Sequence, residues 1–287
     1  RRVGDPGAWD KANRDKPLDR GHLGDFEAHV RRTATSSKYV ETMIPRVRIL
    51  LERCKFDYWS EITAAGLSAT LDDLRNEGLS IQTTNFYLES AKRFCGWMVR
   101  EGRAPDSPIA FMKGGNVRTD RRHDRRALSP EALSTLISKT ASEPKRGGMT
   151  GPDRALFYRF LAETGIRVSE ARSLTVASFR LSDKPPTVVV LAAYSKHRRD
   201  DTLLLRADLA AKLKSSLCGK TPTAAAFKLP DRPVKLLKQD LAAAGIPYVD
   251  DANKFADLHS LRHSVISNLA RAQVHPNIAK ELARHRP

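Results

Sequence analysis

Several cationic or imidazole-bearing residues stand out in the second part of this sequence. Arg167 follows a Thr-Gly-Ile turn signal, Lys196 lies in a polar loop, and the segment His259-Ser-Leu-Arg262 carries two more candidates. His285 ends the run Glu-Leu-Ala-Arg-His. His259 and Arg262 are three residues apart, which puts both side chains on one face of a helix. Taken singly, each residue has an ordinary structural explanation as a solvated or structural side chain.

Together these residue types suit one chemical task, the binding of a phosphodiester in position for reaction. Two guanidiniums can clamp non-bridging phosphate oxygens bidentately. Fixed donors also stabilise the charge that grows as phosphorus becomes five-coordinate, and losing one such donor costs on the order of 100–1,000-fold in rate. A Lys can protonate a leaving oxygen, and a His exchanges protons near neutral pH. We expect no metal, ATP or other cofactor, because no paired carboxylates with the metal-ligand spacing of a two-metal nuclease are visible and no GxxxxGK[ST] loop occurs.

The ordered set ETGIRVSEARSL, YSK, HSLRHS and ELARH resembles the catalytic domain of the tyrosine recombinase (phage integrase) family. The resemblance implies that Arg167 and Arg262 hold the scissile phosphate. It implies that Lys196 acts as general acid toward the leaving 5′-oxygen and that His259 assists proton transfer. His285 fills the last histidine position of the family, which contacts the phosphate.

Two further positions matter to the resemblance. Glu170, one turn beyond Arg167, matches an acidic residue that helps orient the family's active site, although an ordinary helix-surface acid explains it nearly as well. The family also carries a nucleophilic tyrosine shortly after its last histidine. This sequence ends at Pro287, and its six tyrosines all precede His259. We therefore expect a chain truncated before its nucleophile, which grips DNA but forms no covalent intermediate as it stands.

The resemblance implies a site-specific DNA recombinase that cleaves and rejoins strands through a 3′-phosphotyrosine intermediate. Its partner is double-stranded DNA, on which the family assembles as a homotetramer and passes through a Holliday junction. Two alternatives stay open. A catalytically inactive DNA-binding or regulatory relative is one, and a tyrosine just after Pro287 would exclude it. A type IB topoisomerase is the other, and supercoil relaxation without site preference would favour it.

These residues need a scaffold, and 287 residues are enough for two domains. Residues 1–21 are predicted to be a tail. Over residues 22–113, apolar side chains recur at steps of three and four, which predicts a helical domain with helices at 40–54, 68–76 and 81–98. Pro45 is expected to kink the first of these. The resemblance implies that this is the family's core-binding (SAM-like) domain.

The second domain, residues 129–287, is predicted to mix helices with a small β-hairpin or sheet, so the fold class is mainly α. Its helices are expected at 129–140, 152–163, 168–174, 206–217, 231–244, 260–272 and 276–284. Aliphatic and β-branched residues at 187–193 and 202–205 predict two strands joined by the loop that carries Lys196. The resemblance identifies this part as a mixed α+β catalytic domain.

Charge is distributed unevenly along the chain. Lys and Arg number 50 and Asp and Glu 33, which gives +17, of which residues 1–113 supply +3 and residues 114–287 supply +14. Nucleic acid is the commonest partner of such a basic chain. Residues 114–128 are predicted to be a basic interdomain linker suited to lie along phosphates. The predicted DNA-binding residues of the linker and the hairpin loop are Arg118, Arg121, Arg122, Arg125, Arg126, Arg198 and Arg199.

The composition also bears on location. No apolar run approaches the roughly 18–20 residues that a membrane span requires, and the N-terminus has no apolar signal segment. The three cysteines lie far apart without a CxxC pair. We therefore expect no membrane association and a reducing, cytoplasmic location close to DNA.

Overall fold

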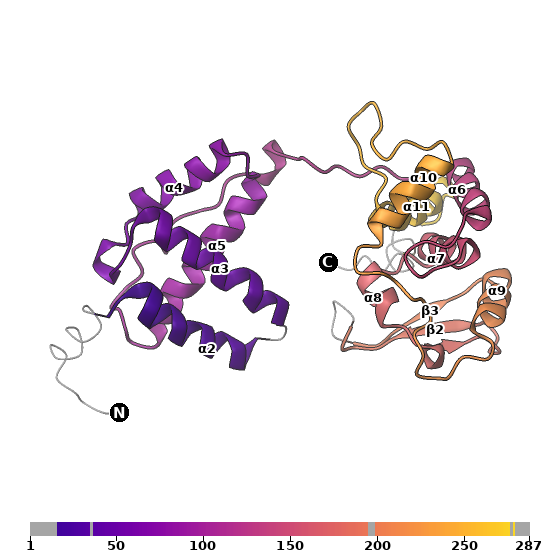
Figure 1. Ribbon diagram of the computed structural model, residues 1–287, viewed down its shortest axis with the longest axis horizontal. Coiled ribbons are helices and arrows are strands. Elements are labelled where there is room, and N and C mark those ends of the chain that lie inside the picture. Colours follow the sequence, from indigo (N-terminus) through magenta and orange to yellow (C-terminus); the bar gives the residue numbers. More distant parts are fainter. Residues whose placement is uncertain (1–15, 35–36, 195–198, 276–277, 279–287) are drawn as a thin grey trace. The chain divides into compact units, whose positions relative to one another are not determined.

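The structure is a computed structural model that describes residues 16–34, 37–194, 199–275 and 278. The chain divides into two compact units, Arg1–Arg122 (unit 1) and His123–Pro287 (unit 2). Figure 1 shows the helices and strands of both units. Each unit has an apolar core of its own. The division falls inside the segment predicted to be the linker, so residues 123–128 are part of unit 2.

Unit 1 is built from helices. Its elements are the π-helix η1 (Leu18–Leu23), the α-helices α2 (Gly24–Thr33), α3 (Ser37–Cys54), α4 (Ala64–Asn76) and α5 (Ile81–Arg100), and the 3₁₀ turns η2 (Trp59–Glu61) and η3 (Val117–Thr119). Hydroxyl side chains cap two of these helices. Thr63 accepts a hydrogen bond from the N–H of Gly66, and Ser80 accepts one from Thr83, both at 3.1 Å. These caps satisfy N–H groups that a first helical turn leaves without partners.

The apolar stripes that predict helices in unit 1 form its core. α3 runs through Pro45 without a break and buries the face that the periodicity predicts, Val40, Met43, Ile44, Val47, Leu50 and Leu51. Phe26 of α2 packs on α5, with ring centroids 5.4 Å from Phe94 and 5.3 Å from Trp97. The predicted tail is too long, because Leu18 is fully buried and η1 begins there. Two buried leucines five positions apart give no helical period in the sequence.

Unit 2 combines six α-helices with a small sheet among its described residues. The helices are α6 (Pro130–Ser142), α7 (Gly151–Thr164), α8 (Val168–Ser173), α9 (Ala207–Leu217), α10 (Val234–Ala243) and α11 (Leu258–Arg271). A 3₁₀ turn, η4 (Val176–Ser178), leads into the sheet. The prediction of a mainly α fold with a small sheet is confirmed. Of the last helix predicted, 276–284, all residues except 278 lie outside the described ones.

The sheet has three antiparallel strands in the order β1, β2, β3. β2 (Thr187–Val190) pairs with β3 (Asp201–Leu204), with Val190 opposite Asp201. Val188 and Val190 are fully buried, as alternation along a half-covered strand requires. β1 (Phe179–Arg180) pairs with the other edge of β2 and was not predicted, because two residues are too short to show a period.

Helix α7 runs through the core of unit 2 and packs against both α6 and α11. Four of its large side chains are almost wholly buried, Phe157, Tyr158, Phe160 and Leu161. At its start, Thr150 and Asp153 cap each other's backbone N–H groups. At its end, the chain turns at Gly165. The position of both ends of α7 is therefore set by local sequence as well as by packing.

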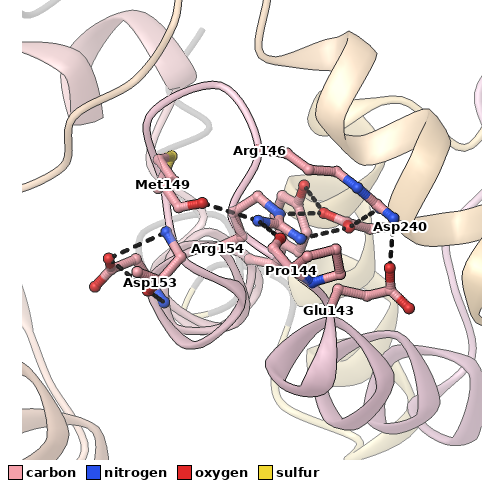
Figure 2. A network of polar contacts seen from close by, with 9 residues as sticks. Glu143, Pro144, Arg146, Met149, Asp153, Arg154 and Asp240 are labelled. Atoms are coloured by element: carbon pink, nitrogen blue, oxygen red, sulfur yellow. Dashed lines mark hydrogen bonds and ion pairs between the residues drawn. The ribbon is translucent and has the colours of Figure 1, made fainter.

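A buried ion pair joins α7 to α10. Arg154 and Asp240 are both fully buried, and the guanidinium donates to the two carboxylate oxygens at 2.8 and 3.0 Å. Arg154 also donates to the backbone carbonyls of Pro144 and Met149, each at 3.0 Å (Figure 2). A buried charge pair is stable only when its remaining polar groups are also satisfied. This network therefore holds α10 and the loop before α7 in one arrangement.

Three more side chains complete the network. The hydroxyl of Tyr158 donates to Asp240 at 2.8 Å. Burial, followed by the neighbouring Asp240 carboxylate, raises the pKa of Tyr158 above its usual range. Arg146 bridges Asp240, at 3.3 Å, and Glu143, at 2.5 Å. Tyr158 thus serves as a structural hydrogen-bond donor inside the core.

One feature of the helices bears on membranes. Across the described residues, no helix combines the length and the apolar composition that a bilayer span requires.

Candidate functional site

The turn between α7 and α8 positions the first predicted site residue, Arg167. Gly165, the residue after α7, has a φ of 63°, in the left-handed region that glycine adopts without strain. Ile166 is buried beneath the turn, and Arg167 is the N-cap residue of α8. The run Thr-Gly-Ile-Arg therefore places Arg167 directly after a sharp turn whose shape depends on glycine.

Glu170 holds Arg167 from within α8. Its carboxylate accepts one hydrogen bond from the backbone N–H of Arg167, at 3.0 Å, and another from Nη1 of its guanidinium, at 2.9 Å. The side chain of Glu170 is 1% exposed, whereas that of Arg167 is 23% exposed. Glu170 is therefore no ordinary surface acid. It is a buried carboxylate that fixes Arg167 while leaving part of the guanidinium accessible.

Arg262 reaches the same turn from α11. Its Nη1 donates a hydrogen bond to the carbonyl oxygen of Gly165, and the side chain is buried. The last carbonyls of a helix carry the negative end of its dipole, so they are favourable partners for a guanidinium. The structure thus brings Arg167 and Arg262, which are far apart in sequence, to one turn.

His259 lies one helical turn before Arg262 on α11. The pKa of His259 is lowered to about 4, mainly by partial burial and also by the charges of Arg125, His263 and Arg262. The Asp257 carboxylate opposes this shift, because it raises the pKa. The His259 and His263 rings are in edge-to-face contact at 5.3 Å. At neutral pH this imidazole is therefore uncharged, so it can accept a proton but has no second proton to give.

The start of α11 depends on a residue that the sequence interpretation missed, Asp257. Its Oδ1 accepts the backbone N–H of Ser260 at 3.0 Å, and Ser260 Oγ accepts the N–H of Asp257 at 3.0 Å. Its Oδ2 accepts hydrogen bonds from Arg125 Nε at 2.7 Å and from His123 Nε2 at 3.1 Å. The D-x-x-S spacing is a helix-start signal that could have identified the cap, but nothing local indicates the partners.

Three predicted site residues, Lys196, Arg198 and His285, lie outside the described residues. The structure does describe the strands on either side of the Lys196 loop. β2 ends at Val190 and β3 begins at Asp201, so this loop joins two paired strands of the sheet.

The predicted DNA-binding arginines differ in how the protein holds them. Three from the linker are bonded to groups of their own unit. Arg122 bonds Asp120 at 2.6 Å and the carbonyl of Gly78 at 2.5 Å, Arg125 bonds Asp257, and Arg126 donates to the carbonyl of Pro247. Exposure does not separate the arginines, because Arg122 and Arg125 are exposed, as are Arg118, Arg121 and Arg199. The Nε of Arg199 lies 3.8 Å from Asp201.

Two comparisons with known sequences bear on the family of this chain. The sequence profile of the phage integrase family matches residues 127–287. A comparison with curated protein sequences found no match.

Solved structures resemble this chain over most of its length. A lambda integrase dimer bound to a COC′ core site has 16% identity and a TM-score of 0.72, and the match covers 93% of this chain and 91% of that one. A lambda integrase tetramer bound to a Holliday junction has 15% identity and a TM-score of 0.70, with 100% and 79% covered. The Tn1549 transposon integrase in complex with transposon right end DNA has 13% identity and a TM-score of 0.69, with 92% and 91% covered. At these identities the likeness establishes the fold.

Proposed function

This chain belongs to the phage integrase family, and on that premise we propose that it is a site-specific DNA recombinase. In the proposed reaction a tyrosine hydroxyl attacks a backbone phosphorus, a 3′-phosphotyrosine bond forms, and the 5′-oxygen leaves with a proton. Attack by the 5′-hydroxyl of another strand reverses these steps and rejoins DNA. The phosphoester bond energy is kept in the covalent intermediate throughout.

The pairing of two guanidiniums at one turn supports this reaction most directly. Arg262 is bonded to the carbonyl of Gly165, and Arg167 follows two residues later, held by Glu170. A scissile phosphate beside this turn meets donors that are already oriented. Such donors stabilise the five-coordinate transition state without reorganising during the reaction. We assign Arg167 and Arg262 to the non-bridging phosphate oxygens.

The remaining roles concern protons and the phosphate. We assign Lys196 as general acid toward the leaving 5′-oxygen and His285 as a further phosphate contact. His259, neutral at pH 7, is assigned to accept a hydrogen bond or a proton on the side of the attacking hydroxyl. The proton of the tyrosine hydroxyl and the proton gained by the 5′-oxygen therefore pass through different groups.

The proposed substrate is double-stranded DNA, and the proposed assembly is a homotetramer that passes through a Holliday junction. The charge of +14 over residues 114–287 supports an anionic partner. The exposed residues Arg118, Arg121 and Arg199, with Arg198 from the same hairpin loop, are proposed to contact phosphates. The likeness to a lambda integrase tetramer on a Holliday junction supports the assembly.

A covalent-trapping experiment tests the proposal. The full-length gene product is used to select its preferred duplex from a random library. That duplex is then nicked on the 3′ side of the cleavage point, so that the short fragment carrying the new 5′-hydroxyl diffuses away and the protein stays linked to the 3′-phosphate. We expect a covalent complex that survives denaturation. Arg167→Ala and Arg262→Ala should each reduce its rate of formation by on the order of 100–1,000-fold, with duplex affinity largely kept.

Lys214→Ala, on the exposed side of α9, is the matched control and should cleave at the normal rate. Tight, selective binding without any covalent complex would overturn the recombinase proposal in favour of a DNA-binding relative. Relaxation of supercoiled DNA without site preference would overturn it in favour of a topoisomerase.

A further inference from the structure

Residues His123–Arg126 run alongside the loop that precedes α11. The N–H of Phe255 donates to the carbonyl of Asp124 at 2.7 Å, and the N–H of Arg126 donates to the carbonyl of Phe255 at 3.0 Å. These bonds form a short parallel bridge between Arg125 and Phe255. The imidazole of His123 also stacks on the ring of Phe255, with centroids 4.0 Å apart. The segment is thus fixed to unit 2 through its backbone before any charge is considered.

The charged contacts of this segment converge on one carboxylate. Asp257 accepts hydrogen bonds from Arg125 and His123 through Oδ2, while its Oδ1 caps the first turn of α11. The side chain of Asp257 is 13% exposed and that of Arg125 is 37% exposed. Partial burial by itself raises the pKa of Asp257, but the hydrogen bonds from Arg125 and His123 prevail and lower it. Asp257 therefore stays ionised and joins the segment to the cap of α11.

We propose that Arg125 and Asp257 form a clasp that positions the first turn of α11, and with it His259, for the proposed reaction. Both are positioning residues, since they act through His259 and the helix cap. Arg125 consequently serves the active site from inside unit 2, in place of the phosphate contact that its sequence context suggests. The inference rests on the proposed function for its catalytic meaning, but the clasp itself can be tested without DNA.

The charges around His259 give the clasp a distinctive signature. The groups that act on this imidazole are Arg125, from the segment before α6, and Asp257, Arg262 and His263, from α11 and its cap. Arg125 lowers the pKa of His259, whereas Asp257 raises it. Removing one partner of the clasp should therefore move this pKa in the opposite direction from removing the other. If the clasp only stabilised the fold, removing either partner would loosen the site. Both variants would then raise the pKa of His259 toward its usual value.

The test follows the titration of His259 by NMR in the full chain carrying ¹³C-labelled histidine, with the signal assigned by its loss in His259→Gln. Arg125→Gln should raise the pKa of His259 by on the order of 0.5–1 pH unit, because a nearby positive charge is removed. Arg125→Lys, which keeps the charge, should restore most of the original value. Asp257→Asn, which still caps a helix, should lower the pKa of His259 below that of the wild type. Arg118→Gln, which removes the same charge from the exposed η3, is the control and should change nothing.

The outcomes separate the clasp from its alternatives. Upward shifts in both Arg125→Gln and Asp257→Asn would indicate a loosened helix and overturn the electrostatic clasp. No shift in Arg125→Gln would also overturn it. A melting temperature recorded for each variant shows whether unit 2 is still folded, and Arg125→Lys supplies a folded comparison if Arg125→Gln is not.

A second measurement connects the clasp to the reaction. In the covalent-trapping assay, Arg125→Gln should move the acidic limb of the pH–rate profile to higher pH. The size of this move should equal the increase in the pKa of His259 measured by NMR. Failure to trap any covalent complex, with the NMR shifts as expected, would remove the proposed function and leave the clasp intact. Normal trapping with an unmoved acidic limb would show that the clasp plays no part in the reaction.

Discussion

The guanidinium of Arg262 is hydrogen-bonded to the carbonyl oxygen of Gly165, so the end of α7 and the first turns of α11 meet at one contact. Gly165 adopts a φ of 63°, and a Cβ built there would lie 3.8 Å from Cγ of Arg262, an ordinary contact distance. Backbone conformation, and not lack of space, therefore requires glycine at this turn. Any residue that changes this conformation moves the carbonyl to which Arg262 is bonded.

Gly165→Ala should destabilise unit 2 by about 1–2 kcal/mol, because an L side chain is strained in the left-handed region. All three tryptophans, Trp9, Trp59 and Trp97, belong to unit 1. Tryptophan fluorescence during urea unfolding therefore follows unit 1, while far-UV circular dichroism follows both units. We expect an earlier unfolding transition in the dichroism and an unchanged one in the fluorescence.

Two variants test whether backbone strain causes the loss of stability expected for Gly165→Ala. Gly165→Asn should be milder than Gly165→Ala, since Asn tolerates the left-handed region. Gly24→Ala, in α2, meets no atom within 4 Å at a helical φ of −63° and should be neutral or slightly stabilising for unit 1. A Gly165→Ala protein as stable as the wild type would show that the turn adapts without strain.

Local sequence is sufficient to predict this turn but not what lies against it. The run Glu-Thr-Gly-Ile-Arg predicts a helix end at Gly165 and a new helix near Arg167, and α7 and α8 are arranged in that way. The hairpin of β2 and β3 is likewise visible in its aliphatic residues. Each of these features depends on neighbours a few positions away, which is the range over which periodicity and turn chemistry act.

The contacts that sequence reasoning missed join distant segments. The basic run around Arg125 predicts a DNA contact, whereas in the structure its Nε is 2.7 Å from Asp257. Arg154 and Asp240 give no local signal either, since each sits on a different helix. Whether a charged side chain faces solvent or a distant partner is decided by tertiary packing. A charge pattern alone therefore does not indicate which arginines are bonded within the protein.

Asp240→Ala should destabilise unit 2 by about 3–5 kcal/mol, because it leaves the Arg154 guanidinium buried without its counter-ion. Tyr158→Phe, which removes only one hydrogen bond to Asp240, should cost about 1 kcal/mol. The free energy of unfolding from urea titrations followed by dichroism checks both values.

The double variant Arg154→Met with Asp240→Leu isolates the cost of the unpaired charge. It removes both charges and should recover much of the stability that Asp240→Ala removes. A double variant less stable than Asp240→Ala would mean that the network stabilises unit 2 through its geometry, beyond neutralising a charge.

The stability of unit 2 should fall as the pH drops from about 6.5 to about 4. His259 has a pKa of about 4 in the folded chain against its usual 6.5, so the unfolded chain binds more protons between these values. The contribution of His259 is complete above pH 6.5 and decreases as the pH falls toward 4. His259→Gln should flatten the dependence of the unfolding free energy on pH in this window. Equal slopes in the wild type and His259→Gln would contradict the assignment.

The salt dependence of DNA binding should distinguish Arg118 and Arg199 from Arg125, whose guanidinium is bonded to Asp257. Each phosphate that a variant no longer neutralises reduces the slope of log K against log salt concentration by about 0.9. Changing Arg118 and Arg199 to Gln should therefore flatten the slope stepwise, as measured by fluorescence anisotropy with a labelled duplex. Arg125→Gln removes the same charge from a side chain bonded to Asp257, so it should leave the slope unchanged. A slope reduced equally by Arg125→Gln would mean that Arg125 leaves Asp257 for a phosphate when DNA binds.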